Sequence, residues 1–63
     1  MENKLKKISD YEWLVTLTDN GKPIFSTRIY KDKKWYCNDH NTRESKTLSE
    51  MKNYFMDNIN DFI

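Results

Sequence analysis

The sequence predicts a small α+β protein in which a three-stranded antiparallel sheet is followed by one C-terminal helix, in the order β-β-β-α. Residues 11–18 and 24–30 are dense in β-branched and aromatic side chains that alternate with period two. Between them, Asn20-Gly21 is the dipeptide that tight hairpin turns favour. Residues 48–62 carry apolar side chains at helical spacing.

Length and composition limit what this chain can build. With 63 residues we expect a single domain, 1–63, near the lower limit of independent folding. Hydrophobic residues make up 37% and charged residues 33%, so a small core must rely on its aromatic side chains. One Gly and one Pro argue against disorder despite this polarity.

Cysteine usage and residue bias predict a location. A single Cys37 cannot form an intramolecular disulfide, which favours a reducing, cytoplasmic setting. Residues 1–8 are basic without an apolar run behind them, so neither a signal peptide nor a membrane span is expected. The Lys-, Asn- and Ile-rich usage is typical of a low-GC bacterium or its phage, and a phage protein would act in the bacterial host cell.

The N-terminal segment, residues 1–10, admits two interpretations. It adds a fourth strand at the edge of the sheet, or it is a flexible arm. Its lysines suit an edge strand, because charge there discourages aggregation.

The predicted strands define two faces. Tyr11, Trp13, Val15 and Leu17 lie on one side of the first strand, and Asn20-Gly21 predicts a type I′ turn. Pro23 suits the start of the second strand. A weaker turn at residues 32–33 leads to a third strand at residues 35–38.

Two-residue loops at both turns would oppose Leu17 to Ile24 and Trp13 to Arg28. The face expected beneath the helix then carries Tyr11, Trp13, Val15, Leu17, Ile24, Arg28, Tyr30, Trp35 and Cys37. The opposite face carries Glu12, Leu14, Thr16, Thr18, Phe25, Thr27, Ile29 and Tyr36. A three-residue loop at either turn would slip this assignment.

After a polar loop at residues 39–46, Thr47 and Glu50 match a capping box that begins a helix. The helix is expected to reach about residue 62, with Leu48, Met51, Phe55, Ile59 and Phe62 on one stripe. One helix covers one face of the sheet. We therefore expect Leu14, Phe25, Ile29 and Tyr36 to form an exposed apolar surface for a protein partner or a second copy. Alternatively, a slipped register, the N-terminal segment or the His40 loop covers them.

Catalytic chemistry is not expected. Cys37, Asp39 and His40 are neighbours in the sequence, but one Cys and one His do not complete a zinc site or a nucleophile with its base. His40, Arg43 and Lys46 are explained by a solvated loop. We expect no enzyme activity, no metal, no cofactor and no small-molecule substrate.

Charge is unevenly distributed along the chain. Residues 20–46 are rich in Lys and Arg, whereas residues 47–63 are mainly acidic. Aromatic residues interleaved with cations on a sheet are typical of single-stranded nucleic-acid binding. The candidate contacts are Lys22, Arg28, Tyr30, Lys31, Lys33, Lys34, Arg43 and Lys46. The net charge of only +1 argues against this function.

The segment 21–30 resembles a stretch of the PC4-like transcriptional coactivators, in which a Gly-Lys turn precedes an apolar strand ending in Arg-x-Tyr. A Leu-Ser helix start, as at Leu48-Ser49, follows later. The resemblance implies a curved antiparallel sheet followed by a helix, dimerisation and single-stranded DNA binding. It would make Lys22, Arg28 and Tyr30 DNA contacts. The approach to the helix, residues 42–47, departs from that family's pattern.

The sequence thus favours a non-catalytic protein-binding module, such as a phage- or mobile-element-type inhibitor or regulator of a larger host protein. Anti-defence and host-takeover proteins form that class. The alternative is a single-stranded nucleic-acid-binding protein that uses a basic aromatic sheet surface.

Overall fold

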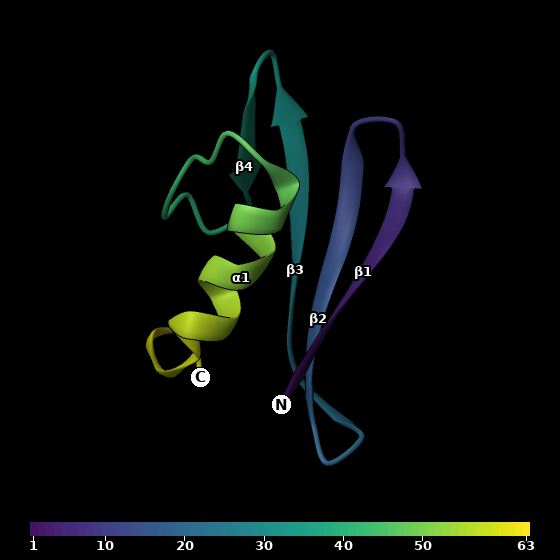
Figure 1. The fold of residues 1–63 in the computed structure, drawn as a ribbon, viewed down its shortest axis with the longest axis vertical. Coiled ribbons are helices and arrows are strands. Elements are labelled where there is room, and N and C mark those ends of the chain that lie inside the picture. The colour runs from purple at the N-terminus through teal and green to yellow at the C-terminus, as the bar shows by residue number, and fades with distance from the viewer.

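A computed structural model describes residues 1–63 as a four-stranded antiparallel sheet with one helix packed on one face (Figure 1). The strands are β1 (Glu2–Ser9), β2 (Glu12–Asp19), β3 (Lys22–Asp32) and β4 (Trp35–Asn38), and they lie side by side in chain order. Helix α1 (Leu48–Asp57) and a short 3₁₀ turn, η1 (Ile59–Asp61), follow. The predicted α+β fold is confirmed, and the N-terminal segment forms the fourth strand.

Two-residue turns join β2 to β3 and β3 to β4. The first lies where the sequence predicts it, whereas the second is formed by Lys33 and Lys34, one residue later than predicted, because Asp32 pairs with Trp35. Asp19 pairs with Lys22 across Asn20 and Gly21, whose φ angles of 52° and 79° are the positive values that a type I′ turn needs. Lys33 also has a positive φ, 56°, in the turn between β3 and β4. The first predicted strand starts one residue later than expected, because β2 begins at Glu12 and Tyr11 lies in the preceding turn.

A β-bulge at the start of β3 shifts the register. Leu17 pairs with Phe25 and Thr18 with Pro23, so Ile24 has no partner on β2. Such an extra residue reverses the face of every side chain beyond it relative to a regular ladder. The predicted pairing of Leu17 with Ile24 is therefore wrong, although the turn itself has the predicted length.

The bulge corrects the two faces. The face beneath α1, called the covered face, carries Trp13, Val15, Leu17, Phe25, Thr27, Ile29, Tyr36 and Asn38. The other face, called the open face, carries Glu12, Leu14, Thr16, Ser26, Arg28, Tyr30, Trp35 and Cys37. A regular ladder would have placed the Arg28 guanidinium under the helix and Ile29 in solvent. Burying a charge is costly, whereas burying Ile stabilises by about 1.5–3 kcal/mol, so the bulge is favoured.

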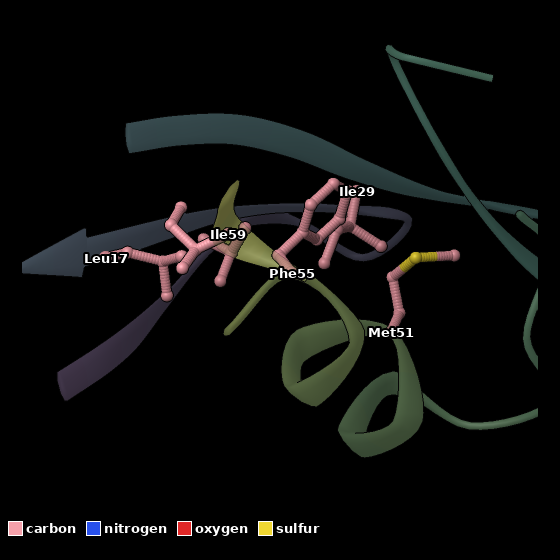
Figure 2. Close-up of a cluster of buried hydrophobic side chains, with 6 residues drawn as sticks. Leu17, Ile29, Met51, Phe55 and Ile59 are labelled. Atoms are coloured by element: carbon pink, nitrogen blue, oxygen red, sulfur yellow. The ribbon is translucent and has the colours of Figure 1, made fainter. Parts of the chain in front are cut away.

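The core lies between the covered face and one side of the helix. Val15, Leu17, Ile29, Met51, Phe55 and Ile59 form one buried cluster (Figure 2). Only 10 of the 63 residues are buried, so the loss of any one of these side chains removes a large part of the core. Phe25 extends the cluster, with its ring 5.6 Å from Phe55 and 5.3 Å from Phe62.

Helix α1 begins where the sequence predicts and ends earlier. The Thr47 hydroxyl accepts a hydrogen bond from the Glu50 N–H at 3.1 Å, as in the first half of a capping box. At the other end, both the side chain and the backbone N–H of Asn58 donate to the Tyr54 carbonyl, at 2.9 and 3.1 Å. This local bonding ends the helix at Asp57, and the apolar stripe continues into η1 through the buried Ile59.

Ile29 and Leu14 test the corrected faces. Ile29→Ala should lower the free energy of unfolding by about 2–5 kcal/mol, because its side chain is fully buried. Leu14→Ala, on the open face, should cost about 1 kcal/mol. Urea denaturation of both variants measures the difference. A larger loss for Leu14→Ala would contradict the register described here.

The bulge itself can be tested by deletion. Removing Ile24 should leave Leu17 opposite Phe25 in a regular ladder, so the loss of stability should match that of Ile24→Ala. Removing Ser26 should instead turn Phe25 away from the helix and cost about 2 kcal/mol more. Thermal unfolding compares the three variants, and equal losses from the two deletions would refute the bulge assignment.

Candidate functional site

The four residues expected to form an apolar docking surface do not share a face. Ile29 is fully buried in the core, and Phe25 packs among the aromatic rings beneath the helix. The Tyr36 ring lies 5.5 Å from that of Trp13, also on the covered face. Leu14 alone lies on the open face. The expected surface is therefore not formed, because the bulge turned three of its members inward.

The open face is organised around Arg28. Its Nη1 donates to Glu12 Oε2 at 3.0 Å, and its Nη2 donates to Asp39 Oδ1 at 2.9 Å. The guanidinium also lies 4.9 Å from the centre of the Tyr30 ring. Hydrogen bonding to Asp39, and then to Glu12, raises the pKa of Arg28 above its already high ordinary value. Two carboxylates thus neutralise the cation at the centre of this face.

The other candidate anion contacts are dispersed. Lys22 lies at the start of β3, whereas Lys33 and Lys34 lie in the turn after its end, so an 11-residue strand about 33 Å long separates them. The Lys31 ammonium lies 5.1 Å from the Tyr36 ring on the covered face, and the Arg43 guanidinium lies 5.5 Å from the Tyr54 ring. A pocket of about 440 Å³ brings together Lys34, Lys46 and Trp35. Tyr30 and Arg43 line a second pocket, so the predicted contacts lie in two separate pairs and do not form one continuous surface.

The loop after β4 is held by a buried side chain that sequence reasoning did not single out. Asn38 is fully buried, and its Nδ2 donates to the Arg43 carbonyl at 3.1 Å. Its Oδ1 accepts from the His40 N–H at 2.9 Å. Beyond the loop, Ser45 and Tyr36 exchange backbone hydrogen bonds of 2.8 and 3.0 Å. The chain thereby covers part of the outer edge of β4.

The outer edge of β1 has no such cover. β1 is the first strand of the sheet and pairs only with β2, and Figure 1 shows no strand beyond it. The Lys31 N–H donates to the Tyr11 carbonyl, so the backbone groups of Tyr11 point toward β3. Because these directions alternate along an antiparallel strand, odd-numbered residues of β2 bond with β3 and even-numbered residues bond with β1. On β1, therefore, Glu2, Lys4 and Lys6 bond with β2. The backbone groups of residues 3, 5 and 7 point outward.

Side chains along this edge are mostly exposed and include three lysines and one glutamate. Every residue of β1 except Asn3 is exposed, including Leu5 at 37% and Ile8 at 53%. Lys4 and Lys6 point to the open face, opposite Thr16 and Leu14. The sequence shows lysines at alternate positions around Leu5, a pattern that suits an edge strand. Only the structure shows that this strand is the unpaired edge of the sheet.

A polar cleft of about 330 Å³ lies between β4 and its loop, lined by residues that include Cys37, Asn41 and Glu44. Cys37 was expected beneath the helix, but the shifted register places it on the open face, half-buried. Burial raises the pKa of the Cys37 thiol, and the negative charges of Glu44 and Asp32 raise it further. The thiol is thus held in its protonated, less nucleophilic form.

No family model, curated protein or solved structure matches this chain. The resemblance to the PC4-like coactivators therefore stays a prediction. No cluster of three His, Cys, Asp or Glu side chains is placed to hold a metal ion. None of the helices has the length and apolarity needed to cross a bilayer.

The raised pKa of the Cys37 thiol can be measured by alkylation. Alkylation by iodoacetamide requires the thiolate, so its rate in the folded protein should rise at a higher pH than in the protein unfolded in urea. Because the folded-state pKa is raised, this group's contribution to stability is fully present below the unfolded-state pKa. That contribution is lost as pH rises through the folded-state pKa. Mass spectrometry follows the alkylation, and a lower midpoint in the folded protein would contradict the assignment.

Proposed function

We propose that this chain is a non-catalytic protein-binding module that docks through the outer edge of β1. The observation that carries the proposal is the exposed strand itself, with the backbone groups of residues 3, 5 and 7 directed away from the sheet. A free strand edge accepts an extended segment of a partner, whose backbone adds hydrogen bonds in register. The exposed Leu5 and Ile8 lie on the same strand and offer apolar contact area.

The charge arrangement favours a protein over a nucleic acid as the partner. Single-stranded nucleic acids are bound by a continuous basic groove with aromatic rings available for stacking. Here Arg28 is neutralised by Glu12 and Asp39, and the turn lysines lie at opposite ends of β3. A chain that carries both charge signs and a net charge of +1 suits oriented docking on a protein surface.

The size and residue usage fit a small inhibitor or regulator of a larger host protein, of the phage or mobile-element type. In this proposal the sheet and helix hold one edge rigid, and the partner supplies the pairing strand. A rigid edge loses little conformational entropy on binding.

Leu5→Pro tests the proposal. The Leu5 N–H points outward, so proline should remove one edge donor without breaking a hydrogen bond to β2. In a pull-down from a low-GC bacterial lysate, the wild type should capture a protein that Leu5→Pro loses. Leu5→Ala is the matched control, because it keeps the N–H, and it should retain the protein. Mass spectrometry identifies the captured chain, and circular dichroism checks that each variant is folded.

Two outcomes would overturn the proposal. Equal capture of the same protein by the wild type and Leu5→Pro would exclude docking by the β1 edge. Capture that disappears after nuclease treatment would favour the nucleic-acid alternative instead.

A further inference from the structure

We infer that the β1 edge selects an extended acidic segment, with carboxylates at alternate positions facing Lys4 and Lys6 and an apolar residue between them facing Leu5. This inference rests on the proposed docking of a protein strand and adds the chemistry of that strand. It follows from the backbone pattern of the edge, from its uncompensated charges and from the position where the edge ends.

The backbone hydrogen-bonding pattern of β1 determines which side chains of the added strand point to the open face and which to the covered face. A strand added beside β1 bonds to the outward groups of residues 3, 5 and 7. Side chains of the added strand that lie opposite Lys4 and Lys6 then point to the open face, and the one between them points to the covered face. Only a segment with the same period-two pattern presents both kinds of side chain correctly.

The charges of Lys4 and Lys6 favour acidic side chains on the added strand. Lys4 lies opposite Thr16 and Lys6 opposite Leu14, so neither has an acidic residue directly opposite on β2. Glu12, diagonal to Lys6, is paired with Arg28. Neither lysine forms an ion pair within the chain, whereas Lys7 pairs weakly with Asp10 at 3.4 Å. Opposite charges on directly facing strand positions attract, and like charges repel. Acidic side chains on the added strand would therefore compensate two cations that the chain leaves free.

Leu5 favours an apolar residue between the two carboxylates of the added strand. Its side chain lies on the covered face beside Val15 and is 37% exposed. An apolar side chain on the added strand would cover it and extend the core outward. The second bulge of the sheet, at Ile8 between the Lys7–Trp13 and Ser9–Glu12 pairs, ends the regular edge there.

A second copy of this chain complements the edge less well than an acidic strand does. Antiparallel self-pairing centred on Leu5 would oppose Lys4 to Lys6 of the other copy twice. Pairing centred on Lys6 would oppose that lysine to itself. Pairing centred on Lys4 would do the same for Lys4, although it would also bring Glu2 opposite Lys6. Pairing centred on Asn3 would bring Glu2 opposite Lys4 but would leave Lys6 without a partner. None of these self-pairing registers places a carboxylate opposite both Lys4 and Lys6, so an acidic strand is the better complement.

Fluorescence anisotropy with labelled peptides tests the inference. One short capped peptide contains Val-Glu-Leu-Glu-Val, and the other has Lys in place of both Glu residues. The wild type should bind the acidic peptide about tenfold more tightly, because two attractive cross-strand pairs replace two repulsive ones. N-methylation of the peptide amides that face β1 should abolish binding, since it removes strand pairing.

Matched charge reversals provide the control. The Lys4→Glu/Lys6→Glu variant should reverse the preference and bind the Lys peptide more tightly. The Lys33→Glu/Lys34→Glu variant has the same net charge but changes the far turn, so it should keep the wild-type preference. Equal effects of the two double variants would overturn the inference, because they would show unspecific attraction. Failure of both peptides to bind the wild type would overturn it as well.

The outcomes separate this inference from the proposed function. If Leu5→Pro loses the captured partner but the Lys4→Glu/Lys6→Glu variant keeps it, docking by the edge stands and the acidic selectivity is refuted. Light scattering of the free protein adds one more check. A dimer that Leu5→Pro dissociates would assign the edge to a second copy and refute both.

Discussion

The structure depends on one extra residue in β3. Ile24 is left without a partner on β2, and this offset brings Phe25 and Ile29 onto the same face as Leu17. Without it, the one helix would cover a face that includes Arg28, and Phe25 and Ile29 would lie in solvent. A sheet of this size has one helix to cover it, so the register decides whether a core forms at all.

The two edges of the sheet are treated differently. At β4, the buried Asn38 shapes the following loop, and Ser45 then bonds to Tyr36. At β1, no other segment bonds to the outer backbone groups. Every residue of the strand is exposed except Asn3, whose side chain donates to the Asn53 side-chain oxygen of α1 at 3.4 Å. Natural proteins commonly protect a free edge with charge, and Lys4 and Lys6 serve that purpose here. The same lysines that oppose self-pairing make the edge selective for a strand of opposite charge.

The cations Arg28 and Lys31, which lie beside aromatic rings, already have contacts within the chain. Lys4 and Lys6, on the unpaired edge of β1, form no ion pair. Arg28 is held by two carboxylates beside the Tyr30 ring, and Lys31 lies against Tyr36. These contacts stabilise exposed pairs only weakly, but they occupy the cations that a nucleic-acid platform would need. Docking through the β1 edge needs no contribution from them.

The sequence by itself determined the elements. Period-two alternation, Asn20-Gly21 and the Thr47 cap are local signals, and they placed the strands, the first turn and the start of the helix. It did not determine the faces, because a bulge is decided by the total apolar area that the helix can bury, which no local pattern expresses. The sequence also did not determine the site. Lys4 and Lys6 are candidate binding residues only because they lie on β1, whose outer edge the rest of the chain leaves unpaired.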